Sequence, residues 1–260
     1  MPMSEADLEA VRARIAVSRF RIKVIETSVG KVVVKRQRPA RSDWRARAIN
    51  VLARAFGVPL LQAIPEHGGE LAQRIEVARL RRLHEAGVRV PQILHVEAGF
   101  IVLGHVAGTS LVELVEAGGA AAFHAWRDGL DAIADVHGRG SCLSHAFARN
   151  FIAVSGNGLA MIDFEVDPLE VLTLEQAQAR DWLAYLHSTL WLLDAPAEAA
   201  QSVAARLATE RPEVRALVNA AGRRLAPLRH LPRSRRVGGR EIAGLRALAA
   251  FFSLPSTRAT

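Results

Sequence analysis

Several features are scarce in this chain of 260 residues, and each scarcity excludes a class of protein. The single cysteine, Cys142, excludes an internal disulfide framework and suits a reducing compartment. No apolar run approaches the roughly 18 residues that a membrane-spanning helix needs. The first seven residues are acidic and lack an apolar core, so we expect no export signal. Together these absences predict a cytoplasmic protein.

Aromatic residues make up only 5% of the chain, whereas arginine is abundant and the net charge is +8. A basic protein can attract nucleic acid, an anionic membrane or a phosphorylated substrate. The densest basic stretch, residues 223–240, does not alternate with aromatic residues, which argues against nucleic acid as a partner. The alternative is that the arginines are simply solvated on helix faces.

The chain is long enough, and at 50% apolar residues hydrophobic enough, to bury a core in one domain or two lobes. Residues 19–36 alternate like two strands joined by a turn near Gly30. Helices are predicted over 42–56 and from Leu71 to Leu83, and strands over 92–96 and 99–104.

After residue 109 the pattern is mostly helical, interrupted by a predicted hairpin over 151–164. This order predicts an α+β fold with two lobes. The β-rich lobe spans residues 1–104 and the helical lobe residues 105–260, with the link near Leu103 to Gly108. A cleft between two lobes is a common ligand site.

In the predicted hairpin, Asn150 opens the first strand and Asp163 closes the second, which should bring both side chains to the same end. An amide oxygen beside a carboxylate forms a hard-oxygen site suited to Mg²⁺ that carries nucleotide phosphates. These two residues are therefore candidate metal ligands.

Lys35 ends a run of three valines and could supply a point charge to phosphate oxygens. The alternative is an edge lysine that discourages pairing between sheets. Glu76, on the predicted helix that follows, could pair with Lys35 and hold it in place. Its alternative is an exposed glutamate paired locally with Arg79.

The order of these parts resembles the protein-kinase-like superfamily over roughly residues 20 to 193. It is most similar to small atypical bacterial members, including lipopolysaccharide-sugar kinases and aminoglycoside-type phosphotransferases. The resemblance implies a bilobal fold that uses ATP and Mg²⁺, with Lys35, Asn150 and Asp163 as binding residues and Asp181 bracing the catalytic loop. The further stretches that carry it are Glu85–Pro91, Gly108–Leu111 and Val136–Gly140.

The chain departs from that family in its catalytic loop, where His145 occupies the position of the usual aspartate. A neutral imidazole can also accept a hydroxyl proton, although it lacks the negative charge. No Gly-x-Gly-x-x-Gly motif precedes Lys35. Phe164–Glu165 stands where protein kinases have Phe-Gly, which points towards small-molecule kinases.

Two functions follow from these residues. The first is an ATP- and Mg²⁺-dependent phosphotransferase that acts on a hydroxyl of a small molecule, glycan or protein. In it, His145, Lys35 and Glu76 carry the catalytic chemistry. The alternative is a pseudokinase that binds nucleotide and acts as a scaffold or regulator.

The predicted 42–56 helix is basic and amphipathic, with Arg47 and Arg54 opposite an apolar face. Such a helix can lie on anionic lipid, which would place the protein peripherally at the inner membrane surface. A helix packed on the first lobe, with its arginines solvated, is the favoured alternative.

Overall fold

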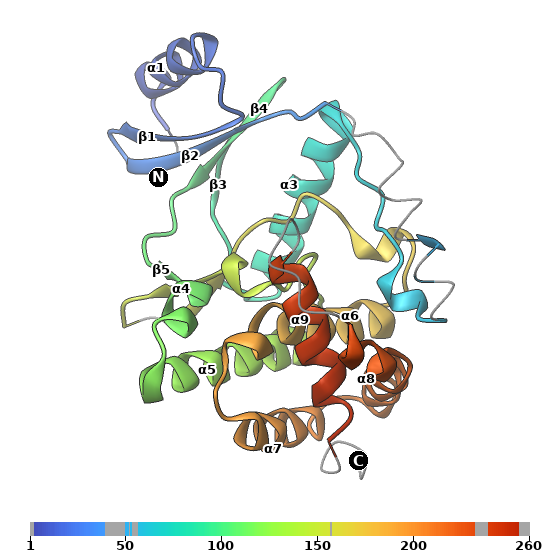
Figure 1. The fold of residues 1–260 in the computed structure, drawn as a ribbon. Coiled ribbons are helices and arrows are strands. Elements are labelled where there is room, and N and C mark those ends of the chain that lie inside the picture. Colours follow the sequence, from blue (N-terminus) through green and yellow to red (C-terminus); the bar gives the residue numbers. More distant parts are fainter. Residues whose placement is uncertain are drawn as a thin grey trace.

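The structure is a computed structural model that describes residues 3–39, 50–51, 53, 57–156, 158–231 and 239–254. It has an α+β fold in which a small antiparallel sheet, with helices α1 and α3 beside it, precedes a mostly helical remainder (Figure 1). The predicted α+β class is therefore confirmed. In the part of the chain that the structure describes, no helix is long and apolar enough to cross a membrane.

The four-stranded sheet consists of two hairpins, the first predicted as a hairpin and the second predicted only as two strands. Its strands are β1 (Ile22–Thr27), β2 (Gly30–Arg36), β3 (Ile93–Glu97) and β4 (Phe100–Gly104), in the order β1-β2-β4-β3. Lys35 pairs with Ile22 on one side and Ile101 on the other. Because β2 is an inner strand, the interpretation of Lys35 as an edge lysine is wrong.

Helix α1 (Glu5–Ala16) packs beside this sheet and was not predicted from the sequence. Its buried Val11 joins a small core with Ile25 and Phe100. Asp7 fixes the helix to the β1–β2 turn, because the backbone N–H of Ser28 donates to its carboxylate at 2.9 Å. A second polar anchor joins Arg12 of α1 to Glu97 of β3 at 2.8 Å. The helix therefore covers the sheet through one apolar contact surface and two polar anchors.

Helix α3 (Gly69–Glu85) confirms the second predicted helix and follows a short 3-10 turn, η1 (Pro59–Leu61). Leu80 and Leu83 of α3 belong to the same buried core as Trp126 and Trp182 of the helical part. A continuous core thus joins the two parts of the fold. The predicted 42–56 helix, with Arg47 and Arg54, lies almost wholly outside the described residues.

The helical part begins after the link with a small sheet that orders the candidate site. Strands β6 (Phe151–Val154) and β7 (Gly158–Met161) form the predicted hairpin, and β5 (Thr109–Ser110) pairs with β6. The remaining helices are α4 (Leu111–Glu116), α5 (Gly119–Gly138), α6 (Leu174–Thr189), α7 (Pro196–Leu207), α8 (Pro212–Leu225) and α9 (Gly239–Phe251). Short 3-10 turns connect them: η2 (Ala148–Asn150), η3 (Pro168–Glu170), η4 (Leu190–Leu192) and η5 (Ala226–His230).

Candidate functional site

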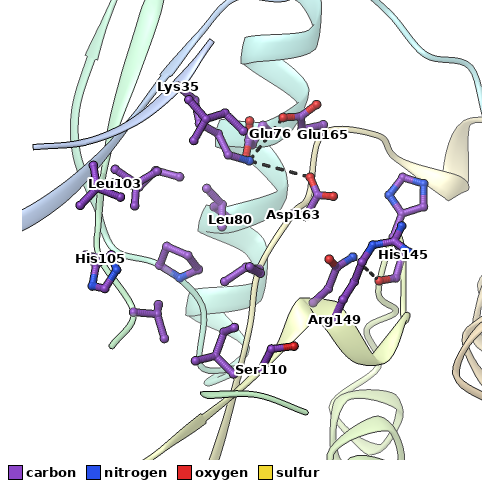
Figure 2. A pocket seen from close by; sticks show the side chains of 18 of the residues that line it. Lys35, Glu76, Leu80, Leu103, His105, Ser110, His145, Arg149, Asp163 and Glu165 are labelled. Atoms are coloured by element: carbon purple, nitrogen blue, oxygen red, sulfur yellow. Dashed lines mark hydrogen bonds and ion pairs between the residues drawn. The ribbon is translucent and has the colours of Figure 1, made fainter. Parts of the chain in front are cut away.

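A cleft of about 950 Å³ lies between the four-stranded sheet and the helical part, and all five predicted site residues line it. Figure 2 shows apolar Leu80 and Leu103 on one side of Lys35 and Asp163, with His145 on the other side. The cleft therefore combines an apolar region with a strongly polar one, as small-molecule sites usually do.

Lys35 and Glu76 form a buried ion pair in this cleft. The Lys35 Nζ lies 2.6 Å from the Glu76 Oε1, and the two side chains are 11% and 6% exposed. This confirms the predicted pair, so the interpretation of Glu76 as an exposed partner of Arg79 is wrong. Burial disfavours the charged ammonium, but the neighbouring carboxylates outweigh it and raise the pKa of Lys35.

Asp163 lies on the open side of the same lysine. Its Oδ1 is 3.8 Å from the Lys35 Nζ, and its side chain is 40% exposed to the cleft. Its φ angle is 72°, the one positive φ of a non-glycine residue within the described ranges. Aspartate is among the few residue types that adopt this conformation readily. The backbone after β7 thus turns sharply where it presents the carboxylate.

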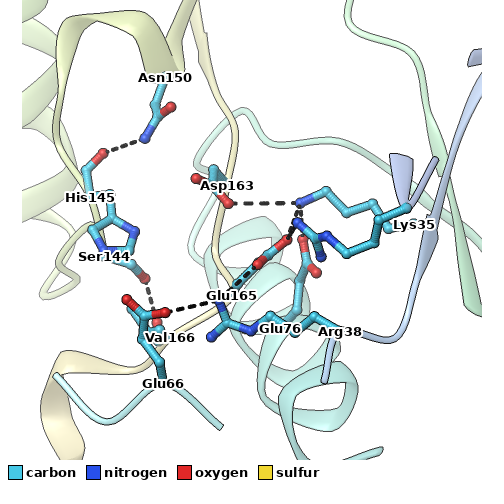
Figure 3. Close-up of polar contacts among 11 residues, drawn as sticks. Lys35, Arg38, Glu66, Glu76, Ser144, His145, Asn150, Asp163, Glu165 and Val166 are labelled. Atoms are coloured by element: carbon cyan, nitrogen blue, oxygen red, sulfur yellow. Dashed lines mark hydrogen bonds and ion pairs between the residues drawn. The ribbon is translucent and has the colours of Figure 1, made fainter. Parts of the chain in front are cut away.

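Asn150 lies beside Asp163 because the hairpin joins their backbones. The N–H of Ile162, next to Asp163, donates to the Asn150 carbonyl at 2.9 Å. The Asn150 side-chain Nδ2 donates to the His145 carbonyl at 2.9 Å, so the amide oxygen lies on the other side (Figure 3). The predicted placement of both residues in the cleft of Lys35 is therefore confirmed.

The side-chain oxygens of Asn150 and Asp163 suit a cation that takes its other ligands from a bound phosphate group. Asn150 and Asp163 offer one amide oxygen and one carboxylate, both hard donors of the kind that Mg²⁺ prefers. Among the residues described, no group of three or more His, Cys, Asp or Glu side chains is placed to hold a metal ion. A cation here would need further oxygens from its ligand, as Mg²⁺ at nucleotide sites usually does.

His145 lines the cleft with its ring stacked near that of Phe147, at 6.1 Å between centroids and 19° between planes. Burial lowers the pKa of its imidazole, and the positive charge of Arg180 adds to this effect, although Asp163 opposes it. The neutral form of the imidazole is therefore favoured. A neutral imidazole can accept a proton from a hydroxyl group.

Glu165 is a central residue of the site that the sequence did not identify. Its Oε1 accepts from Arg21 at 2.7 Å and lies 3.4 Å from the Lys35 Nζ, and its Oε2 lies 3.4 Å from Arg38. Burial disfavours its charge, but Lys35, Arg21 and Arg38 outweigh burial and lower the pKa of the Glu165 carboxyl. The Glu165 carboxylate thus interacts with three positively charged side chains of the cleft.

The loop that carries His145 is fixed from below by α6. The N–H of Leu143 donates to Asp181 at 2.6 Å, so the predicted contact between this aspartate and the loop is present. Asp181 also lies 3.3 Å from His137, which in turn lies 2.6 Å from Glu210. Burial disfavours the charged imidazole, but the two carboxylates outweigh it and raise the pKa of His137. A buried polar network therefore supports the loop.

The same loop is fixed from above by α3. Arg79 donates to the Cys142 carbonyl at 2.8 Å and to the Ser144 hydroxyl at 3.2 Å. Ser144 in turn donates to the Val166 carbonyl at 2.6 Å. Arg79 follows Glu76 by three residues on one helix, so α3 contacts both the lysine and the loop.

The basic stretch after α8 is only partly described. Arg240 lies 3.2 Å from Glu116 and above the ring of Trp191, so it packs on the helical part. Arg233, Arg235 and Arg236 lie outside the described residues. Contact with an anionic membrane stays a prediction.

No model of a known protein family matches the chain, and no curated protein is similar enough to count as a match. The residues of the cleft and their contacts are therefore the basis for assigning a function.

Proposed function

We propose that this protein is an ATP- and Mg²⁺-dependent phosphotransferase with a bilobal, protein-kinase-like fold, acting on a hydroxyl group. One observation carries the proposal. The Lys35 Nζ lies 2.6 Å from Glu76 and 3.8 Å from Asp163, in a cleft that Asn150 and His145 also line. This arrangement supports a site that binds phosphate groups and a cation together.

In such an enzyme, catalysis rests mostly on positioning and charge neutralisation. Lys35 would bind a phosphate oxygen, and Glu76 keeps its ammonium in position from the buried side. Asn150 and Asp163 would hold Mg²⁺, whose charge neutralises phosphate oxygens when it is bound. The apolar side of the cleft, at Leu80 and Leu103, suits the flat face of a base.

His145 would accept the hydroxyl proton of the molecule that receives the phosphate. The acceptor oxygen attacks the terminal phosphorus of ATP, the bond from that phosphorus to the bridging oxygen breaks, and its electron pair leaves with ADP. The hydroxyl proton passes to the neutral imidazole. The lowered pKa of His145 supports this role, because the base must be unprotonated before the reaction.

A pseudokinase is the second candidate, and two observations favour it. His145 lacks the negative charge of the usual carboxylate, and Glu165 already engages Lys35, Arg21 and Arg38 in the cleft. A protein of this kind would bind nucleotide without transferring phosphate.

Thermal unfolding with ATP, with and without Mg²⁺, tests nucleotide binding. We expect Mg²⁺-ATP to raise the melting temperature of the wild type and of Lys31→Met, but not of Lys35→Met. Lys31 is a matched control because it lies on the same strand with its side chain exposed. No stabilisation of the wild type by any nucleotide would overturn the proposal. An ATP-consumption assay then separates the phosphotransferase from the pseudokinase.

A further inference from the structure

A second cavity of about 240 Å³ lies beside the cleft, between the His145 loop and helices α6, α8 and α9. His145 lines this cavity as well as the larger cleft. Figure 1 shows α9 lying beside α6, which places the cavity at their junction. The two cavities therefore share His145 as a lining residue.

Most of the wall of the second cavity is apolar. Leucines from three helices contribute to it, among them Leu183, Leu225 and Leu248. Its volume is below the roughly 300–1,000 Å³ of sites for drug-sized ligands, so it suits a small molecule or one end of a longer one. The aliphatic wall favours an alkyl or alicyclic group.

Arg180 brings a positive charge into this apolar wall. One of its guanidinium nitrogens donates to the carbonyls of Leu60 and Gln62, at 2.6 and 2.7 Å. Within the described ranges, Arg180 forms no direct ion pair with a carboxylate, although most other buried charges near the cleft do. The charge of the adjacent Asp181 only partly offsets burial, which lowers the pKa of Arg180. Burying a charge without a counter-ion is costly, so an anionic ligand group would stabilise it.

The other polar groups of the cavity already have partners. Asp181 accepts from Leu143 at 2.6 Å, and His187 lies 3.2 Å from the backbone carbonyl of Glu241. The Glu241 carboxylate, which also lines the cavity, lies 3.8 Å from His187. The groups left to recognise a ligand are the Arg180 guanidinium and the His145 imidazole. The first suits an anion and the second a hydroxyl group.

We propose that this cavity binds the phosphate acceptor, and that the acceptor is a small amphiphile with an anionic group and a hydroxyl, such as a hydroxy acid. The inference rests on the proposed function. The alkyl part would contact the leucine wall, the anionic group Arg180, and the hydroxyl His145. In the transfer, the hydroxyl oxygen bonds to the terminal phosphorus of ATP while the bond from that phosphorus to the bridging oxygen breaks. The hydroxyl proton passes to His145, and ADP leaves with the electron pair of the broken bond.

Isothermal titration calorimetry with 3-hydroxyoctanoate tests this site directly, with 1,3-octanediol as the uncharged analogue. We expect the wild type to bind the acid at least about tenfold more tightly than the diol, a difference typical of a charged hydrogen bond. Arg180→Gln should remove that preference and leave the affinity for the diol unchanged. Arg127→Gln is the matched control, because Arg127 is exposed on α5.

A second variant fills the cavity without touching the arginine. Ala184 lines the cavity and is partly exposed there, so Ala184→Phe should abolish binding of both the acid and the diol. Ala120→Phe, at an exposed position of α5, should bind both as the wild type does. Equal affinity of the wild type for acid and diol, or unchanged binding in Ala184→Phe, would overturn the proposal.

Mg²⁺-ATP titrations on the same proteins separate this proposal from the phosphotransferase function. One outcome is that the protein binds the acid through Arg180 but does not bind nucleotide. The cavity would then remain an anion-binding site, but its role as the site of the phosphate acceptor would be overturned. Nucleotide binding with no heat from the acid would overturn the cavity proposal alone.

Discussion

Asn150 donates its side-chain N–H to the backbone carbonyl of His145 across a five-residue loop, at 2.9 Å. The bond fixes which end of the amide faces the cleft, because its nitrogen is occupied and its oxygen is left for a ligand. It also joins the candidate cation ligand to the candidate base. A substitution of either residue should therefore be tested for its effect on both cation binding and proton transfer.

Asp163 should be required for the effect of Mg²⁺ on nucleotide binding. Asp163→Asn removes the charge while keeping a residue type that tolerates the φ of 72°. We expect it to keep its fold and to lose the Mg²⁺-dependent part of the ATP-induced rise in melting temperature. Asp135→Asn, an exposed position on α5, is the control. A full Mg²⁺ effect in Asp163→Asn would remove Asp163 from the cation site.

The activity should depend on His145 and on pH. Only the neutral imidazole accepts a proton, and its pKa is lowered chiefly by burial. The rate should therefore be flat near pH 7 and fall only below about pH 6.5, the ordinary pKa of histidine.

His145→Ala should lower turnover by about 10²–10⁴-fold and keep nucleotide binding. His145→Asp should keep or raise turnover, with His124→Ala as an exposed control. Full turnover in His145→Ala would exclude the catalytic role. A wild type without turnover that gains it in His145→Asp would instead support the pseudokinase.

Removing one partner of the buried Lys35–Glu76 pair should destabilise the fold. Both side chains are nearly inaccessible, at 11% and 6% exposed, so Lys35→Met leaves a buried carboxylate without its cation. Breaking such a pair typically costs about 3–5 kcal/mol. Urea unfolding should show this loss in Lys35→Met, and a smaller one in the double variant Lys35→Met/Glu76→Leu. Additive losses in the double variant would show that the two side chains are not energetically coupled.

Cys142 should be unreactive while the protein is folded. It is buried behind the loop, and burial raises the pKa of its thiol to about 12. Because the thiolate is the nucleophile, alkylation by iodoacetamide at pH 8 should be more than about tenfold slower in the native protein than in urea. Mass spectrometry of the intact chain measures this directly, since it has a single cysteine. Equal rates in both states would mean that the loop opens readily.

The elements that sequence predicts well are those whose signal is local. The β1–β2 hairpin follows from alternating β-branched residues around Gly30, whose φ of 98° suits the turn. Helix α1 was missed because it buries few apolar side chains, chiefly Leu8 and Val11. Its polar anchors, Asp7 to Ser28 and Arg12 to Glu97, join residues that are distant in the sequence.

The same distinction holds for the candidate site. Lys35 and Glu76 were found because each stands in a recognisable strand or helix within a known order of parts. Glu165 was not, because its role depends on Arg21, 144 positions earlier in the chain, and on Arg38. Arg180 lies within helix α6, and the sequence around it does not indicate its contacts with Leu60 and Gln62. Such contacts depend on tertiary packing.

Helix α3 places Glu76 against Lys35 and Arg79 against the loop that presents His145. A ligand that changes the Lys35–Glu76 contact should therefore alter the free energy of the loop, even at a site that it does not touch. Thermodynamic reciprocity then requires that an occupant beside His145 change nucleotide affinity by the same factor. We expect this cooperativity to disappear in Arg79→Met, and ATP titrations with and without 3-hydroxyoctanoate would measure it. The helix would thus act as an allosteric connection between donor and acceptor.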